Sequence, residues 1–224
     1  MQREHEDNPI IFGVTADPFT PAHLEMVRPY ISARRKVYII PTVVTYHRPN
    51  YKPTLSDVER LAVIEDLLSS LGYEYRPYWQ IWDKELKMKF VCNELSSELF
   101  DEVIRKRRFI HTLIDFITSE NIRFPSVLIG TDEFNNFKSW HRWEDIIKLC
   151  KLIVVPGRQG ESLKYSTDDF PFTVAAPLPP PYNLISATKI RKCYADHPLP
   201  CVPYLRDYRK FCNGELSLQD LDWI

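Results

Sequence analysis

The first forty residues contain the pattern that most restricts the fold: an apolar run, a helical segment and a second apolar run. Residues 10–14 (IIFGV) lie between Pro9 and Asp17-Pro18, which indicates a short buried strand ending in a glycine-assisted turn. A helix is predicted over residues 22–34, and residues 37–40 (VYII) form the next strand before Pro41. Strand, helix and strand in this order predict a βαβ unit with a right-handed crossover, and therefore a parallel sheet.

The same alternation continues to the C-terminus. Helices are predicted over residues 56–71, 93–107, 143–150, 188–195 (with Ser186 near its N-cap) and 204–212, and strands over 126–130 and 152–155. Residues 177–181 contain four prolines, which exclude regular structure there. The pattern predicts an α/β fold: a Rossmann-like, doubly wound parallel sheet with flanking helices and a C-terminal helical piece. We expect a flexible tail over residues 1–9 and a single domain over 10–224, with residues 185–224 as its helical part.

Charge and cysteine content exclude several classes of protein. The 29 basic and 30 acidic residues nearly cancel, so neither a nucleic acid nor a membrane surface is expected as a partner. The five cysteines are scattered and never spaced as CxxC, which favours free thiols over disulfides or a zinc site. The first nine residues are too polar for a signal peptide, and no apolar run approaches a membrane span of about 20 residues. A cytoplasmic protein is therefore expected.

Two predicted helix starts carry side chains that suit phosphate. The first follows the strand with Gly13 and Thr15, and places Thr20 and His23 on one face of the helix. Unpaired backbone N–H groups and the positive end of the helix dipole favour an anion there. A simple turn at Asp17-Pro18 with Thr20 as an ordinary N-cap explains the segment equally well.

The second helix start, residues 185–191 (ISATKIR), offers two hydroxyls and a cation, although caps and solvated charges would also explain it. Two such starts together would serve a nucleoside triphosphate. Neither GxxxxGK[ST] nor GxGxxG occurs, so the P-loop and the ordinary dinucleotide-binding site lack their residues.

These segments resemble the signatures of one enzyme superfamily. Thr20 to His23 resembles the [T/H]xGH signature, and Ile185 to Arg191 the ISSTxIR signature, of the nucleotidyltransferases that include nicotinate- and nicotinamide-mononucleotide adenylyltransferases. Further segments resemble the bacterial nicotinate branch in the expected order: His47-Arg48 after IIP, Thr112-Leu113, Gly130 to Trp140 with Trp143 following, the loop ending at Arg158, and Val202-Pro203.

The resemblance implies a reaction in which the phosphate of a pyridine mononucleotide attacks the α-phosphorus of ATP, so that a dinucleotide forms and Mg-pyrophosphate leaves. Its partners would be ATP and that mononucleotide. It implies His23, Thr20 and Arg191 as catalytic residues. It implies an ATP site formed by Gly13, Thr15, His23, Gly130, Asp132, Ile185, Ser186, Thr188 and Arg191. Mg²⁺ would bind to the phosphates, and no metal site made by the protein is expected.

The acceptor site implied by the resemblance centres on Trp140, whose indole would stack on the pyridine ring, while Trp143 is expected in the core. Its remaining members would be His47, Arg48, Lys52, Thr112 and Arg158, although a basic loop at residues 47–52 has the composition of a solvated surface as well. The sequence is compatible with a homo-oligomer.

The chain departs from the family pattern at several positions. Val14, Ala16 and Ala22 replace a glycine, a phenylalanine and a glycine, and Arg108-Phe109 stands where nicotinate-binding relatives carry Tyr-Thr. The choice between the acid and the amide mononucleotide therefore stays open. Two alternatives remain: pantetheine-phosphate adenylyl transfer or cytidylyl transfer to a small phosphate acceptor, and a non-catalytic nucleotide-binding relative.

Overall fold

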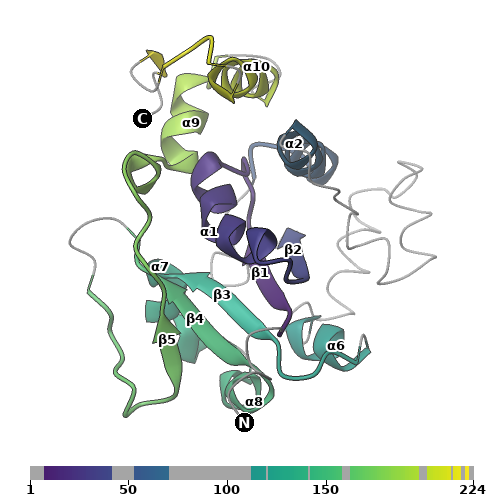
Figure 1. Ribbon diagram of the computed structural model, residues 1–224, viewed down its shortest axis with the longest axis vertical. Coiled ribbons are helices and arrows are strands. Elements are labelled where there is room, and N and C mark those ends of the chain that lie inside the picture. The colour runs from purple at the N-terminus through teal and green to yellow at the C-terminus, as the bar shows by residue number, and fades with distance from the viewer. Residues whose placement is uncertain are drawn as a thin grey trace.

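The computed structural model describes residues 8–41, 53–70, 112–119, 121–140, 142–157, 162–196, 201–212, 214–217 and 220–221. Its centre is a parallel sheet of five strands in the order β2-β1-β3-β4-β5 (Figure 1). The strands are β1 (Ile10–Val14), β2 (Val37–Pro41), β3 (Ser126–Gly130), β4 (Lys151–Val155) and β5 (Phe172–Val174).

The strand order reverses direction between β1 and β3. The chain first passes from β1 to β2 on one side and later returns to place β3 on the other side, with Ile10 opposite Ser126 and Phe12 opposite Leu128. In doubly wound sheets the crevice at this reversal, outside the carboxyl ends of the strands, is the usual ligand site. The carboxyl ends of β1 and β3 therefore mark where a site should be sought.

Helices cover both faces of the sheet. One face carries α1 (Pro21–Ser32), α2 (Asp57–Ser70), α9 (Ala187–Cys193) and α10 (Cys201–Cys212). The other carries α6 (Thr112–Ser119) and α8 (Trp143–Leu149), with α7 (Thr131–Asn135) directly after β3. Two short 3₁₀ segments, Phe137–Ser139 and Tyr182–Leu184, connect these elements.

Strands β1, β3 and β4 carry buried apolar side chains on both faces of the sheet, because helices cover both faces. Phe12, Leu128 and Ile153 belong to the core under α1, α2, α9 and α10. Their neighbours along the chain, Ile11 and Val127, belong to the core on the opposite face. This two-sided burial explains why the strands read as continuous apolar runs rather than alternating ones.

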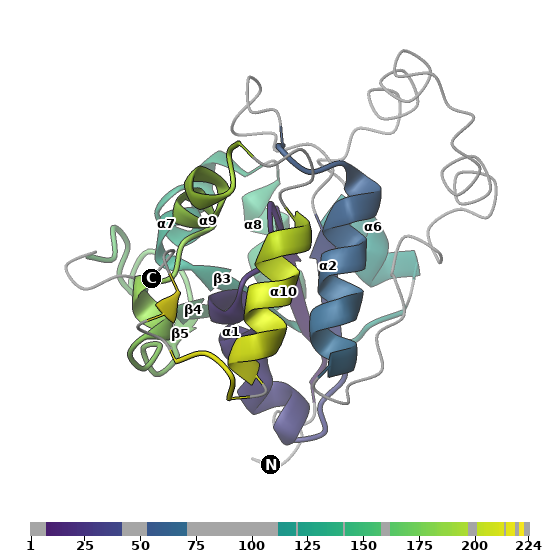
Figure 2. The ribbon, with the colours of Figure 1, turned by 90° about the horizontal axis from the view of Figure 1, so that it is seen from above.

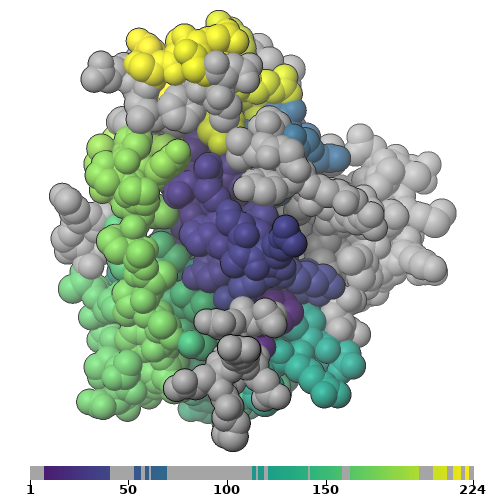
Figure 3. Space-filling view, viewed as in Figure 1, coloured from purple at the N-terminus to yellow at the C-terminus, as the bar shows by residue number. Residues whose placement is uncertain are grey.

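The C-terminal helix lies against the second helix of the chain. Figure 2 shows α10 beside α2, where Arg209 Nε donates to Asp66 Oδ2 at 3.0 Å. Figure 3 shows the surface of the purple N-terminal unit next to the green segment that leads from β5 to α9. The N-terminal unit and the segment after β5 are thus neighbours on one face.

The predicted α/β class is confirmed, and so are the strands of the first βαβ unit and the two strands at 126–130 and 152–155. Helix α10 begins at Cys201 rather than at residue 204, because Pro203 falls in its first turn, where proline is tolerated. The predicted helix over 93–107 lies outside the described residues. Within the described part of the chain, no helix is long and apolar enough to cross a membrane.

The turn after β1 was predicted to depend on Gly13, and that prediction was wrong. Gly13 lies inside β1, whereas the positive φ of 53° belongs to Ala16. The sharp change of direction therefore comes three residues after the glycine, directly before Asp17-Pro18.

Candidate functional site

Helix α1 begins with a capping box that ties Thr20 to His23. Thr20 is the N-cap, Pro21 occupies the first helical position, and the Thr20 hydroxyl accepts from the His23 backbone N–H at 3.3 Å. The His23 ring returns the contact, because its Nδ1 accepts from the Thr20 backbone N–H at 3.0 Å. The prediction that these two side chains share one face is confirmed, and each holds the other in place.

The hydrogen bond from Thr20 determines which nitrogen of His23 carries the proton. A neutral imidazole has one N–H and one acceptor nitrogen, so a ring that accepts at Nδ1 carries its hydrogen on Nε2. The ring packs near Phe12 and Phe19, at centroid distances of 6.1 and 5.4 Å. His23 as a residue is half-buried, and desolvation of its ring lowers the pKa to about 4, against a smaller opposing effect of Asp132. His23 is thus a neutral donor through Nε2 at physiological pH.

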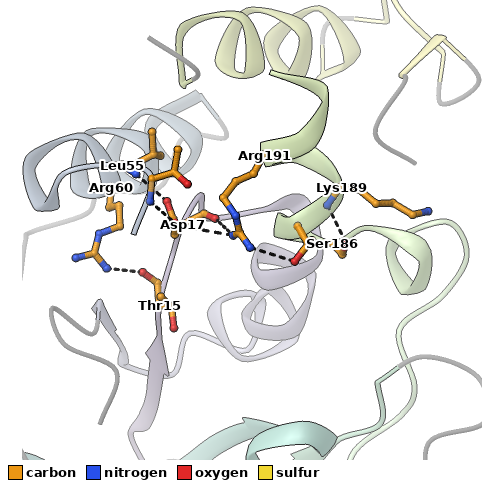
Figure 4. A network of polar contacts seen from close by, with 9 residues as sticks. Thr15, Asp17, Leu55, Arg60, Ser186, Lys189 and Arg191 are labelled. Carbon is orange, nitrogen blue, oxygen red and sulfur yellow. Dashed lines mark hydrogen bonds and ion pairs between the residues drawn. The ribbon is translucent and has the colours of Figure 1, made fainter. Parts of the chain in front are cut away.

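The loop between β1 and α1 is held by groups from three other segments of the chain, and Figure 4 shows the contacts made by Arg60 and Arg191. Arg60 of α2 is almost fully buried and donates from Nη1 to the Thr15 carbonyl at 2.7 Å. Tyr204 of α10 donates to the Phe19 carbonyl at 2.8 Å, and Arg191 of α9 donates to the Asp17 carbonyl. The loop that precedes His23 is therefore fixed along most of its length.

Arg191 joins the second helix start to the first. Its Nη1 contacts both the carbonyl and the carboxylate of Asp17, with 3.7 Å to Oδ2, and its Nη2 donates to the Thr188 hydroxyl at 3.1 Å. The Arg191 side chain remains 23% exposed. The fold thus brings a guanidinium from residue 191 to the loop that leads into His23, as the paired motifs predicted.

The N-terminus of helix α9 is capped by a serine side chain. Ser186 is the N-cap, and its hydroxyl accepts from the Lys189 backbone N–H at 3.1 Å. Ile185 is buried beneath the helix start, while Thr188 is exposed. The capping role foreseen for Ser186 is confirmed.

The carboxyl ends of β1 and β3 carry the remaining members of the expected ATP site. Asp132 is exposed at the start of α7, and its charge partly opposes the desolvation that lowers the pKa of His23. Gly130 is the N-cap of α7, and a Cβ there would meet Asp132 Oδ1 at 2.9 Å. Among the described residues, no atom lies within 4 Å of the place that a Cβ at Gly13 would take. Thr15 is half-buried and is held through its carbonyl.

Trp140 and Trp143 border an aromatic cluster that includes Phe137 and Phe170. Trp140 is half-buried and packs on Phe137 at 5.3 Å between ring centroids. Trp143 contacts Phe137 at 6.2 Å and Phe170 at 5.8 Å, in agreement with its predicted structural role. The stacking role of Trp140 stays a prediction.

Several predicted acceptor residues lie outside the described part of the chain: His47, Arg48, Lys52 and Arg158. Thr112 is the first residue of α6, and its side chain is likewise not described. Among the described residues there is no group of three or more histidine, cysteine, aspartate or glutamate side chains that could hold a metal ion.

Two residues of the network were not predicted as members of the site. Asp17 stood out only as the residue before Pro18, and Arg60 only as one charge in a helix with several. Their burial, to 2% and 1% exposure, is what distinguishes them from solvated charges. No signal in the local sequence could have revealed it, because the partners of both side chains are distant in the chain.

The chain is similar to a protein family and to several named proteins. A family model described as cytidylyltransferase-like matches residues 11–193. A Serratia proteamaculans protein named "Probable nicotinate-nucleotide adenylyltransferase" is 27% identical over 161 residues, which cover 71% of this chain and 63% of that protein. A Coxiella burnetii protein of the same name is 28% identical over 148 residues, covering 65% of this chain and 59% of that protein. The chain thus spans less than two thirds of the length of these relatives.

Two solved structures share the fold. Both are of the Plasmodium falciparum nicotinic acid mononucleotide adenylyltransferase, one complexed with NaAD and the other with APC. They superpose on this chain with TM-scores of 0.56 and 0.54, at 13% and 14% identity, and cover 92% of this chain and 98% of theirs. At this level of identity the likeness concerns the arrangement of strands and helices.

Proposed function

We propose that this chain, which belongs to the cytidylyltransferase-like family, transfers the adenylyl group of ATP to nicotinate mononucleotide and releases pyrophosphate. Nicotinamide mononucleotide is the second acceptor within the proposal, and cytoplasmic pyridine-dinucleotide synthesis is its setting. The names of the relatives support this choice of acceptor.

One observation carries the proposal: Arg191 is bonded to the loop that ends in the capping box of His23. The guanidinium of Arg191 is thus bonded to the loop that follows β1, and the neutral imidazole of His23 lies in the helix that this loop leads into, although 168 residues separate the two in the chain. That combination suits a polyphosphate, because each group offers N–H donors to phosphate oxygens and the arginine adds charge.

The proposed reaction needs no covalent enzyme intermediate. An oxygen of the acceptor phosphate forms a bond to the α-phosphorus of Mg-ATP, the bridging bond between the α- and β-phosphates breaks, and Mg-pyrophosphate leaves. Catalysis is then positioning and charge stabilisation. His23 Nε2–H donates to an α- or β-phosphate oxygen as charge builds there, and Arg191 with Ser186 and Thr188 holds the phosphates that depart.

Thr20 has a supporting part in this scheme. Its backbone N–H occupies Nδ1 of His23, so that the single ring hydrogen is directed through Nε2. Asp132 is proposed to accept from the ATP ribose, and Gly13 and Gly130 to let the adenosine approach the backbone. Trp140, Thr112, His47, Arg48, Lys52 and Arg158 are proposed to hold the acceptor.

The magnesium ion enters as part of the substrate. Mg²⁺ is proposed to bind to the phosphate oxygens of ATP, because it usually binds through substrate phosphates rather than through a cage of protein ligands. When bound there, it neutralises charge on the departing pyrophosphate. The protein's own contribution remains the donors of His23 and Arg191.

The test is pyrophosphate release from Mg-ATP by the purified protein. Parallel reactions contain nicotinate mononucleotide, nicotinamide mononucleotide, phosphopantetheine or no acceptor, and the product is identified by mass. Release that requires a pyridine mononucleotide, with formation of the matching dinucleotide, supports the proposal. Release with neither pyridine mononucleotide contradicts it, and release with phosphopantetheine alone would assign a different acceptor.

A further inference from the structure

We infer that Asp17 is a positioning residue that holds Arg191 in the orientation needed for phosphate binding. Asp17 lies in the loop between β1 and α1, and its side chain is only 1% exposed. An ionised carboxylate in such a place is costly unless its oxygens are satisfied. Its partners therefore show what the charge is used for.

Both oxygens of the Asp17 carboxylate accept hydrogen bonds from the backbone just before α2 (Figure 4). Its Oδ2 accepts from the Thr54 backbone N–H and its Oδ1 from the Leu55 backbone N–H, both at 2.9 Å. These two bonds fix the direction of the carboxylate at the entrance to α2. A carboxylate that is fixed in this way presents a charge at a defined place.

The guanidinium of Arg191 lies against that defined charge. Nη1 donates to the Asp17 carbonyl and stands 3.7 Å from Oδ2, while Nη2 donates to the Thr188 hydroxyl. The arginine is thus gripped at both terminal nitrogens by groups from two different segments. Holding a long side chain in one rotamer before the ligand arrives lowers the entropy cost of binding.

Asp17 does not need to touch the nucleotide for this role. It acts through Arg191, which the proposed function places on the β- and γ-phosphates, and the inference rests on that proposal. A purely structural Asp17 would instead anchor residues 54–55 to the loop, with no energetic coupling to Arg191. The two roles differ in whether the effects of substituting Asp17 and Arg191 are additive.

A double-mutant cycle on Mg-ATP binding separates these roles. The variants are Asp17→Asn, Arg191→Ala and the double substitution, with the dissociation constant measured by calorimetry at low temperature. We expect Asp17→Asn to weaken binding about 10-fold in the natural background and less than about 2-fold when Arg191 is already alanine. Equal weakening in both backgrounds, or none in the natural background, would overturn the inference.

A matched control removes a different aspartate–arginine pair. Asp66→Asn disrupts the exposed contact between α2 and α10, which lies outside the proposed site, and should leave Mg-ATP binding unchanged. If Asp17→Asn does not fold, Asp17→Ser replaces it, because a hydroxyl can accept from Thr54 or Leu55 without opposing them with an amide N–H.

The same cycle keeps the two proposals distinguishable. Binding of Mg-ATP is measured without an acceptor, so it does not depend on which mononucleotide reacts. A protein that binds Mg-ATP with the expected coupling but releases no pyrophosphate would contradict the proposed function alone. A protein that turns over normally but shows additive effects would contradict only the role of Asp17.

Discussion

His23 illustrates how the surroundings of one residue decide its chemistry. Burial beside Phe12 and Phe19 keeps the ring neutral, and the Thr20 backbone N–H directs its hydrogen to Nε2. Such a ring can donate a hydrogen bond to a phosphate but carries no charge of its own. In the proposed reaction, the positive charge for the departing pyrophosphate therefore comes from another residue, and Arg191 is the proposed source.

Replacing His23 tests whether its ring donates a hydrogen bond in the proposed reaction. We expect His23→Ala to lower kcat by about 100-fold or more, because a donor to the developing charge is lost. His23→Gln should retain more activity than His23→Ala, since its amide can place an N–H near the position of Nε2. Steady-state pyrophosphate release provides the measurement, and a wild-type rate in His23→Ala would remove the residue from the site.

A substitution of Gly13 tests where the adenosine of ATP binds. A Cβ at this position would meet no atom of the described part of the chain within 4 Å, so Gly13→Ala should fold with unchanged stability. If the adenosine approaches the backbone there, the KM for ATP should rise about 10-fold while the thermal midpoint stays the same. An unchanged KM would show that the nucleotide keeps away from Gly13.

Gly214 offers the matched control for that substitution. Its φ of +75° is strained for any residue with a side chain, so Gly214→Ala should cost about 1 kcal/mol of stability. It lies after α10, far along the chain from the strand ends, and its kinetics should match those of the wild type. The two glycine variants thus separate a ligand contact from a backbone requirement.

At the scale of elements, α10 serves the site by holding the loop before His23. Tyr204 is fully buried, and its hydroxyl donates to the Phe19 carbonyl at 2.8 Å. Tyr204→Phe leaves that buried acceptor without this donor, which should lower the free energy of unfolding by about 1 to 3 kcal/mol. Urea denaturation measures the change. Arg209→Ala, which removes an exposed ion pair from the same helix, should cost less than about 1 kcal/mol.

The elements that could be predicted are those whose signal is local. Strands β1 to β4 are short, mostly apolar segments of five residues, and the shortness of each run together with the proline, glycine or charge at its ends favours a strand over a helix. Strand β5 has three residues, two of them exposed, so its pattern differs little from a loop. Helix α7 has five residues and no side-chain cap, which leaves only the turn after Gly130 as a signal.

The site divides in the same way. Thr20, His23 and Ser186 could be predicted because a helix N-cap and its third residue are close in sequence. The contacts of Arg60 and Asp17 that hold the loop after β1 could not be predicted, since their partners are 45 and 38 residues away in the chain. Long-range pairing of buried charges has no periodicity that a sequence would reveal.

At the scale of the whole molecule, the reversal of strand order explains why the site lies where it does. Residues after β1 and β3 meet because those strands are neighbours, and α9 reaches the same edge only after the chain has completed the sheet. The two helix starts are thus joined by tertiary structure rather than by a continuous motif. Loss of the global fold should remove both at once.

The burial of His23 also makes the stability of the whole molecule depend on pH. Its pKa is about 4 in the folded chain and about 6.5 when exposed, so the unfolded state binds more protons between these values. The free energy of unfolding is therefore unaffected by this titration above pH 6.5. It decreases as the pH falls toward 4, by at most about 1.4 kcal/mol per pH unit.

Comparison with His23→Gln isolates this contribution, because glutamine does not titrate. Unfolding free energies of the two proteins, measured by urea denaturation from pH 7.5 to 4.5, should converge as the pH falls, since only the wild type gains the cost of keeping a histidine neutral. Parallel curves would mean that His23 titrates alike in both states, and its ring would then be charged on the acid side of pH 6.5. A charged ring would donate through both nitrogens, which the Thr20 backbone N–H at Nδ1 opposes.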